Sequence, residues 1–318
     1  MCHKTIKDRL TFFFLVTVIF IFSANAFASE KKTFAHGGLD RSYWIYIPDT
    51  WNKADPKPLL VVLHGGWGSG EKIQKLNYEG FNKLADKEGF IVAYPDGIGG
   101  HWNDGRTQTR FRAQRQNIDD VGFISSLIDY LIKEMNIDPK RVYVTGVSNG
   151  AMMTYRLACE ITGKLAAVAP VIGSMPDAYA SKCSPSRSIS VLAINGTEDP
   201  LVPYKGGDIR FGPFGITLGK VKSVPETVNF WATFDKCSFP PEVTYEPDRN
   251  PGDQTKVRRE FYRNCQDGAE VILYAVEGGG HTWPGGMQYR SESLIGRTSK
   301  DIDATTVIWE FLKHHAIK

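Results

Sequence analysis

A serine with a glycine two residues away on each side stands where a β-rich run gives way to a helical pattern. The pentapeptide at 146–150 reads Gly-Val-Ser-Asn-Gly, between the run 141–145 and a predicted helix over 149–159. Small residues at 146 and 150 permit the tight strand-to-helix turn that lifts a serine hydroxyl above a sheet edge. The helix would also direct its electropositive N-terminus at that hydroxyl. This context predicts that Ser148 is a nucleophile.

Such a serine needs a base, because a serine hydroxyl is a weak nucleophile at neutral pH. Three histidines follow Ser148 in the chain, and two of them, His314 and His315, end the predicted terminal helix. The third, His281, follows a β-rich run and lies in a loop with glycines on both sides. His281 is therefore the predicted base.

An acid that orients His281 should leave a strand end between the serine and this histidine. The apolar run 191–194 continues into Asn-Gly-Thr-Glu-Asp-Pro at 195–200. We favour Asp199, with Glu198 as the second choice. Its role would be to hold the tautomer of His281 and to stabilise the imidazolium that forms on proton transfer.

Acyl transfer also needs backbone donors for the developing oxyanion. The amide of Asn149, directly after the nucleophile, is one candidate. The second should come from the loop at 64–68, which reads His-Gly-Gly-Trp-Gly and follows the first long apolar run. Gly66 is the first choice for this donor and Trp67 the next. We interpret His64 as a structural hydrogen-bonding residue, because it precedes the serine in the chain.

Short apolar runs and helical patterns alternate along the chain, which predicts an α/β fold with a mainly parallel sheet flanked by helices. Two strands, 33–36 and 41–48, should be joined by a turn at Gly37-Gly38. Further strands are predicted over 58–63, 90–94, 141–145, 165–172, 189–194 and 269–276, with helices over 76–87, 119–135, 149–159, 224–234 and 305–314. No repeat or linker interrupts this alternation, so we expect residues 29–318 to form a single catalytic domain.

Residues 1–28 have the pattern of a secretory signal peptide. A positive segment with Lys4, Lys7 and Arg9 precedes an apolar stretch over 10–22. Cleavage could follow either Ala-Asn-Ala at 24–26 or Ala-Phe-Ala at 26–28, and we favour the second. An uncleaved anchor is the alternative, although the stretch is short for a bilayer. The protein is therefore predicted to be secreted, to the exterior or the periplasm, and to leave the membrane after cleavage.

Four cysteines remain beyond the signal peptide, namely Cys159, Cys183, Cys237 and Cys265. Export would place them in an oxidising compartment, where an even number suggests disulfide bonds. Three pairings are open, and we favour Cys159–Cys183 with Cys237–Cys265 because each closes a short local loop.

The composition argues against several classes of protein. The chain has 318 residues, 42% of them hydrophobic and 23% charged, which is incompatible with wholesale disorder. Its formal net charge of +3 is not the basic excess of a nucleic-acid-binding protein. No CxxC pair or clustered His/Cys spacing occurs, so no metal is predicted, and no organic cofactor is implied. The oligomeric state is not predicted.

Six motifs follow one another over about residues 33–315, which makes the set more specific than any one of them. They are His64-Gly65-Gly66, Trp102-Asn103-Asp104, Asp119-Asp120-Val121-Gly122-Phe123, Gly146-Val147-Ser148-Asn149-Gly150-Ala151-Met152, Gly196-Thr197-Glu198-Asp199 with Val202-Pro203-Tyr204, and Gly280-His281-Thr282-Trp283-Pro284-Gly285. In this order they resemble the secreted polyhydroxybutyrate depolymerase/feruloyl esterase group of α/β-hydrolases. The resemblance implies an α/β-hydrolase fold and an esterase with Ser148, Asp199 and His281 as its triad. It supports Gly66 and Asn149 as oxyanion donors and agrees with the favoured disulfide pairing.

Two departures from the group bear on the substrate. Some polymer-degrading members have Cys where Gly66 stands. Extracellular polymer depolymerases usually carry a linker and a surface-binding domain, and neither is visible in this sequence. Both points favour soluble or carbohydrate-linked esters.

Aromatic residues near the predicted site are candidates for substrate contact. They are Trp67, Trp102, Tyr204, Phe211, Phe214 and Trp283, of which we choose Trp102, Tyr204 and Trp283 as substrate-binding. Stacked rings would suit a hydroxycinnamoyl group, but packing beneath loops explains the same residues equally well. The Gly-rich stretch 205–220 could form part of the pocket rim. Arginines at 106, 110, 112 and 115 are interpreted as a solvated face rather than a contact for acidic polysaccharide.

The sequence thus predicts a serine esterase that works through an acyl-enzyme. Feruloyl or related carbohydrate-linked esters, such as those of plant cell-wall polysaccharide, are the first choice of substrate. Polyhydroxybutyrate, its oligomers and short acyl esters are the alternative. A serine peptidase of the same fold and an inactive binding module built on this fold are weaker alternatives, the latter disfavoured by the intact Ser148, Asp199 and His281 set.

Overall fold

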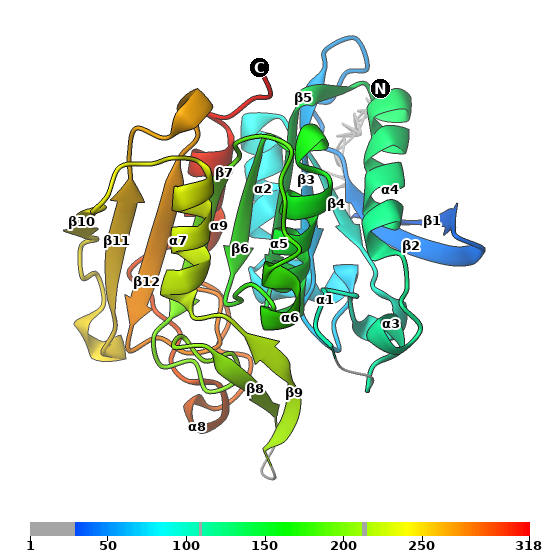
Figure 1. Cartoon of the computed structure of the whole chain (residues 1–318). Helices are drawn as coiled ribbons and strands as arrows, with labels where there is room; N and C mark the ends of the chain where they lie inside the picture. Colours follow the sequence, from blue (N-terminus) through cyan, green and yellow to red (C-terminus); the bar gives the residue numbers. More distant parts are fainter. Residues whose placement is uncertain (1–28, 108–109, 212–214) are drawn as a thin grey trace, which may run out of the picture.

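A ten-stranded sheet forms the centre of the computed structural model, which describes residues 29–107, 110–211 and 215–318 (Figure 1). The predicted signal peptide and Phe214 lie outside these residues. In sheet order the strands are β1 (Glu30–His36), β2 (Leu39–Tyr46), β4 (Ile91–Pro95), β3 (Lys57–Leu63), β5 (Ile137–Val147), β6 (Ala167–Val171), β7 (Ser190–Gly196), β12 (Val271–Glu277), β11 (Lys256–Tyr262) and β10 (Glu242–Tyr245).

The middle of this sheet is parallel and its two flanks are antiparallel. Strands β4, β3, β5, β6, β7 and β12 all run in one direction. The hairpin β1–β2 closes one side, and β11 with β10 closes the other. The predicted mainly parallel α/β architecture is confirmed. Its parallel strands end together at the lower edge of the sheet in Figure 1.

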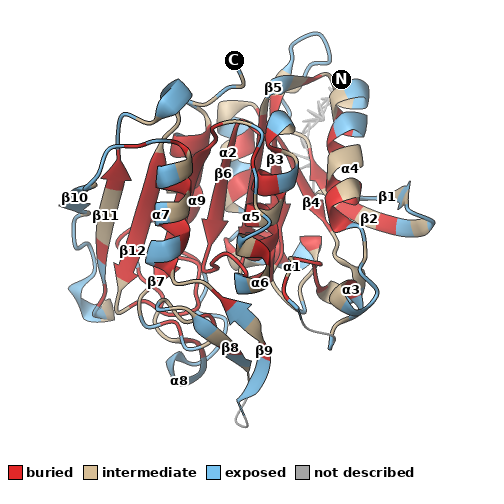
Figure 2. Ribbon diagram, in the orientation of Figure 1, coloured by how far each residue is buried: buried red, intermediate tan, exposed pale blue. Residues whose placement is uncertain are grey.

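Helices cover both faces of the sheet, which explains why its central strands are continuously apolar. One face carries α4 (Asp120–Met135), α5 (Asn149–Glu160) and α7 (Val224–Phe234), and the opposite face carries α1 (Gly70–Leu76), α2 (Gly80–Glu88) and α9 (Ala304–Leu312) (Figure 1). Short helices α3 (Arg112–Arg115), α6 (Asp177–Ala180) and α8 (Glu292–Ile295) lie in connecting segments. The central parallel strands are buried between the layers, while the edge strands β1 and β10 and the outer helix faces are mostly exposed (Figure 2).

Side chains cap the first turns of two of these helices. The Asp119 carboxylate accepts a hydrogen bond from the Gly122 amide at the start of α4. Ser223 and Glu226 form a reciprocal capping box at the start of α7. These side chains satisfy amides that the first helical turn leaves without partners, and so they fix where each helix begins.

One part of the predicted element pattern was wrong, and several elements were not predicted. The helix predicted over 76–87 begins only at Gly80, as α2, because the chain turns at Tyr78 and Glu79, whose φ angles are 54° and 58°; the preceding helix α1 was not predicted. The Gly-rich stretch 205–220 contains β8 (Gly207–Phe211) and most of β9 (Ile216–Val221), which pair with each other outside the main sheet. Strands β10 and β11 were not predicted.

Both disulfide bonds have the favoured pairing. Cys159, near the end of α5, is bonded to Cys183. Cys237, just after α7, is bonded to Cys265, which precedes β12. Each closes a loop of fewer than thirty residues, with sequence separations of 24 and 28. Such bonds are typical of proteins that fold outside the reducing cytosol.

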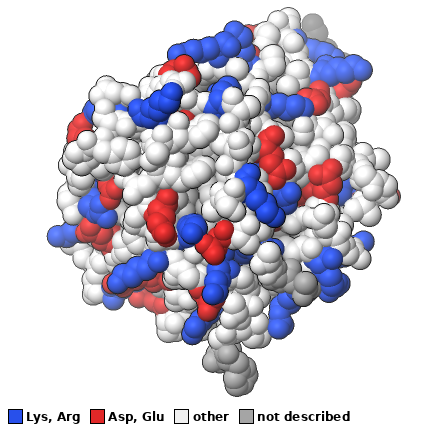
Figure 3. Space-filling view, in the orientation of Figure 1, with Lys and Arg blue, Asp and Glu red and all other residues white. Residues whose placement is uncertain are grey.

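The described ranges contain no helix that is both long and apolar enough to span a membrane. On the face of the molecule shown in Figure 3, Lys and Arg side chains are interspersed with Asp and Glu. No continuous field of one sign covers that face.

Candidate active site

Ser148 lies in a sharp turn between β5 and α5. Its backbone angles are φ 57° and ψ −116°, a conformation that costs energy for any residue other than glycine. The flanking glycines are required by close packing. A Cβ on Gly146 would lie 2.6 Å from the Gly150 carbonyl oxygen, and one on Gly150 would lie 2.4 Å from the Leu63 oxygen. The structure therefore contains the strained strand-to-helix turn that the pentapeptide predicts.

Asp199 and His281 are in direct contact at the same edge of the sheet. The Asp199 Oδ2 and His281 Nδ1 atoms are 2.6 Å apart, and both side chains are almost completely buried. The loops that carry them follow the adjacent strands β7 and β12 and are joined by a hydrogen bond from the Glu198 amide to the Gly279 oxygen. Glu198 itself is exposed. The geometry thus favours Asp199 over the second choice as the partner of His281.

The second oxygen of Asp199 is also occupied. Its Oδ1 accepts hydrogen bonds from the backbone amides of Leu201 and Val202, at 2.8 and 2.9 Å. These bonds fix the carboxylate plane while Oδ2 faces the histidine. Tyr289, which the sequence did not single out, donates from its hydroxyl to the His281 carbonyl oxygen at 3.0 Å. The histidine is therefore held from both its ring and its backbone.

The Ser148 side chain is the least connected member of the candidate triad. In the described part of the chain, no hydrogen bond joins its hydroxyl to the His281 ring. Bonds of this kind are often long without substrate and tighten when it binds. What the structure brings together directly is Asp199 with His281, with Ser148 at the carboxyl end of β5 in the same parallel set.

The loop after β3 borders the serine. A Cβ on Gly65 would lie 3.5 Å from the Ser148 Cβ. His64 holds this loop in place through both ring nitrogens. Its Nε2 accepts a hydrogen bond from the Gly97 amide at 2.9 Å, and its Nδ1 lies 2.7 Å from the Gly65 oxygen. Burial lowers the pKa of His64 to about 4, so the ring is neutral and serves as a structural link, as interpreted from the sequence. The candidate donors Gly66 and Trp67 follow directly in this loop.

Asn149, the other candidate donor residue, has an anchoring side chain that the sequence did not reveal. Its Oδ1 accepts from the Trp102 amide at 2.8 Å, and its Nδ2 donates to Asp104 Oδ2 at 2.5 Å. Asp104 is completely buried and also forms an ion pair with Arg106 at 2.7 Å. The start of α5 is thereby fixed to the segment 102–106.

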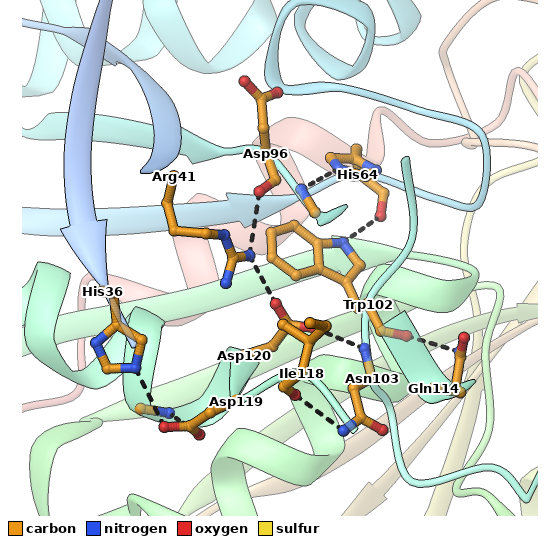
Figure 4. Close-up of polar contacts among 12 residues, drawn as sticks. His36, Arg41, His64, Asp96, Trp102, Asn103, Gln114, Ile118, Asp119 and Asp120 are labelled. Atoms are coloured by element: carbon orange, nitrogen blue, oxygen red, sulfur yellow. Dashed lines mark hydrogen bonds and ion pairs between the residues drawn. The ribbon is translucent and has the colours of Figure 1, made fainter. Parts of the chain in front are cut away.

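A second buried ion pair supports the same segment (Figure 4). Arg41 Nη2 lies 2.6 Å from Asp120 Oδ1, and the Asn103 amide donates to Asp120 Oδ2 at 2.7 Å. The Arg41 guanidinium stacks 3.9 Å from the Phe123 ring centroid. These contacts connect β2 and α4 to the Trp102-Asn103-Asp104 motif, which gives a structural reason for two of the six motifs.

Two of the three predicted substrate-binding side chains are buried. Trp102 and Trp283 are each 0% exposed, and their indole nitrogens donate to the His64 oxygen and to Thr305 Oγ1 respectively. The prediction that these two contact substrate is wrong for this structure, because no surface of either ring is accessible. Tyr204 is half-buried and packs against the core near α7. Two other aromatic side chains at the site are exposed instead, Trp67 at 49% and Tyr289 at 39%.

The arginines at 106–115 do not act as one surface. Arg106 is buried with Asp104, whereas Arg112 on α3 is hydrogen-bonded to Gln116, just after that helix. Across the described ranges, no group of three or more His, Cys, Asp or Glu side chains is arranged to hold a metal ion.

Comparison with known proteins decides the family. A model of the family described as esterase PHB depolymerase matches residues 41–201. The chain belongs to this family. Over 282 residues it is 32% identical to NocK of Nocardia uniformis subsp. tsuyamanensis, a protein named as an esterase, covering 86% of this chain and 80% of NocK.

Two further similarities add detail to this membership of the esterase PHB depolymerase family. Feruloyl esterase B of Piromyces equi is 30% identical over 250 residues, which are 76% of this chain but 42% of that longer protein. An acetyl xylan esterase from Aspergillus awamori has a similar fold, with a TM-score of 0.55 and 19% identity over 80% of this chain and 94% of that one. The chain is therefore a carboxylesterase of a family whose relatives include feruloyl and acetylxylan esterases, and it has the α/β-hydrolase fold.

Proposed function

We propose that this protein is a secreted serine esterase that hydrolyses feruloyl or related carbohydrate-linked esters through an acyl-enzyme. The observation that carries the proposal is the buried 2.6 Å contact between Asp199 and His281, at the same sheet edge as the strained Ser148 turn. A buried carboxylate on Nδ1 leaves Nε2 as the proton acceptor of the ring. That arrangement suits general-base activation of a neighbouring hydroxyl.

In the first half of the reaction, Ser148 Oγ attacks the ester carbonyl carbon and passes its proton to His281 Nε2. The carbonyl oxygen becomes an oxyanion, which the amides of Gly66 and Asn149 stabilise, with the Trp67 amide as the alternative to Gly66. When the tetrahedral intermediate collapses, His281 gives its proton to the departing alcohol. The acyl group stays on Ser148 as an ester.

In the second half, His281 takes a proton from water and the resulting nucleophile attacks the acyl-enzyme. The same amides stabilise the second oxyanion. Collapse returns the proton from His281 to Ser148 Oγ and releases the carboxylic acid. Asp199 keeps its negative charge throughout and stabilises the imidazolium. Residues 29–318 supply every group in this scheme and act as one catalytic unit.

Two observations support carbohydrate-linked substrates over polymer. The relatives reported above include a feruloyl esterase and an acetyl xylan esterase by name. Gly66 is backed by His101, because a Cβ at this position would lie 3.1 Å from His101 Nε2. The larger cysteine of some polymer-degrading members would therefore not fit without moving that ring. Polyhydroxybutyrate, its oligomers and short acyl esters are the second candidate.

A comparative rate panel tests the proposal. Purified protein is assayed on methyl ferulate, acetylated xylan, tributyrin and amorphous polyhydroxybutyrate, beside the Ser148→Ala variant. We expect the highest kcat/KM on methyl ferulate and loss of all activity in the variant with an unchanged circular dichroism spectrum. Retained activity in the variant would refute the serine mechanism. Preference for polyhydroxybutyrate would select the second candidate, and peptide cleavage without ester hydrolysis would indicate a peptidase.

Export is tested separately. The two disulfide bonds and the sequence of residues 1–28 support secretion. Expression of the full chain in a secreting bacterial host should yield mature protein that begins near residue 29 by N-terminal sequencing. Recovery of the intact N-terminus on membranes would instead indicate an anchor.

A further inference from the structure

Trp67 lies in the loop whose Gly65 borders the candidate nucleophile, and half of its surface is exposed. It follows Gly66 in the loop that borders Ser148, and it is 49% exposed. Its backbone has φ 56°, a left-handed conformation that is uncommon for a bulky residue. Strain of this kind is concentrated at functional sites, where the surrounding structure imposes it. The exposure and the backbone strain together indicate that the indole ring of Trp67 has a functional role.

Three other rings hold the indole from separate segments of the chain. Its centroid lies 4.6 Å from that of Phe211 on β8, with the planes tilted by 34°. Phe111 meets it edge-on at 5.2 Å and His101 at 4.9 Å. His101 and Phe111 are themselves stacked at 3.6 Å. We refer to these four residues as the aromatic wall.

The wall is held in place by the β8–β9 hairpin. Ile209, Leu218 and Val221 of this hairpin are buried against Met152 in the first turns of α5 and Val202 after the acid. Arg106 Nη1 donates to the Leu218 carbonyl oxygen at 2.9 Å. The hairpin is thus attached to the elements that carry Ser148 and Asp199, and Phe211 is positioned relative to them.

We infer that the aromatic wall is the subsite for a planar aromatic acyl group, with Trp67 and Phe211 as its specificity-determining side chains. This inference rests on the proposed function and identifies how that site selects its substrate class. Planar rings gain from offset or edge-to-face contact with aromatic side chains beyond simple burial of area. An aliphatic acyl chain makes no such contact, so the wall discriminates by ring geometry.

The sheet order indicates which half of the ester the wall contacts. The loop with Trp67 follows β3, on one side of β5, whereas His281 follows β12, on the other side. In the proposed reaction His281 protonates the leaving alcohol, so the alcohol departs toward the β12 side. The acyl group is then directed toward the β3 side, where Trp67 lies.

The test compares three esters on two variants, Trp67→Ala and Phe211→Leu. Methyl ferulate carries its ring in the acyl half, phenyl acetate carries it in the alcohol half, and ethyl acetate has none. We expect the ratio of kcat/KM for methyl ferulate to that for ethyl acetate to fall about tenfold in Trp67→Ala, mainly through KM, and less in Phe211→Leu. The ratio of kcat/KM for phenyl acetate to that for ethyl acetate should stay within about twofold of its wild-type value in both variants. Tyr245→Ala is the matched control, since Tyr245 is 57% exposed on the edge strand β10 and lies outside the site.

The outcomes separate this inference from the proposed function. An unchanged ferulate-to-acetate ratio in both variants would overturn the inference, even if Ser148→Ala is inactive. An equal fall for phenyl acetate would place the ring in the alcohol half and also overturn it. A parallel loss on all three esters would mean that Trp67 only shapes the oxyanion loop. If Trp67→Ala fails to fold, Phe211→Leu decides the question alone.

Discussion

The side chain of Asn149 donates to Asp104 Oδ2 over 2.5 Å, which joins the residue after the candidate nucleophile to a buried carboxylate 45 positions earlier in the chain. Asp104 is in turn neutralised by Arg106, and Arg106 also holds the β8–β9 hairpin. One network therefore positions both the start of α5 and the hairpin beside the site. Disturbing it should affect chemistry as well as stability.

Replacing Asn149 by alanine tests this network. The variant leaves the Trp102 amide without its acceptor in the interior, so we expect the free energy of unfolding to fall by about 1–3 kcal/mol. Because α5 then loses its anchor, kcat should also fall, by about tenfold, with a smaller change in KM. Urea unfolding and steady-state kinetics measure the two effects.

Thr154→Val is the matched control for Asn149→Ala. Its hydroxyl donates to the Gly150 oxygen within α5 and is equally buried, but it makes no contact with segment 102–106. This variant should lose stability and keep its kcat. If both variants lose kcat to the same extent, the network has no special role in the site.

Asp199→Asn removes the charge that orients His281. We expect kcat to fall by about 10³- to 10⁴-fold with the fold intact, because an amide can stabilise the wrong tautomer of the ring. Glu198→Gln changes the neighbouring exposed carboxylate and should leave the rate nearly unchanged. A large loss in Glu198→Gln with a small one in Asp199→Asn would exchange the two assignments.

The Arg41–Asp120 ion pair is open to a double-mutant cycle. Both side chains are buried, so Arg41→Met alone leaves the Asp120 carboxylate buried without its ion-pair partner. This variant should lower the free energy of unfolding by about 3–5 kcal/mol. The double variant that also carries Asp120→Asn should regain part of the lost free energy of unfolding, because the uncompensated charge is removed. Additive losses in chemical denaturation would show that the pair is not energetically coupled.

Asp235 should make stability depend on pH. Burial raises the pKa of this carboxyl group to about 7, against 3.8 as its ordinary value. The native state therefore holds a proton that the unfolded chain has lost, and the free energy of unfolding falls as pH rises from about 4 to about 7. Asp235→Asn should flatten this part of the profile, because the amide keeps an acceptor for the Ile189 amide without titrating. Thermal unfolding at a series of pH values measures this dependence. If the free energy of unfolding changes equally with pH in wild type and variant, the assignment to Asp235 is contradicted.

Much of the fold could be predicted because its central strands are buried on both faces. The apolar runs at β3, β5 and β7 stand out in the sequence, and the order of Ser148, Asp199 and His281 follows from which strands they succeed. Strand β10 could not be predicted, since all of its residues are exposed and, in the described sheet, it pairs at the edge with β11. A strand of this kind has no apolar alternation to reveal it.

The burial of aromatic residues in loops could not be predicted from the sequence. Trp102 and Trp283 lie in loops rich in polar residues and glycine, yet both are buried by tertiary contacts. Trp67 lies in a similar loop and is exposed. Nothing local distinguishes the three, because burial of a loop side chain depends on segments that are distant in the chain. The Asn149–Asp104 contact was hidden for the same reason.

Labelling with a fluorophosphonate tests the central claim, that Ser148 is the nucleophile, most directly. The protein is treated with a fluorophosphonate probe, digested and analysed by tandem mass spectrometry, with residual esterase activity measured in parallel. The account predicts one adduct per chain, located on Ser148, and loss of activity in proportion to labelling, with no adduct in Asp199→Asn over the same short exposure. Complete inactivation with the adduct on another residue, or full activity with Ser148 modified, would contradict it.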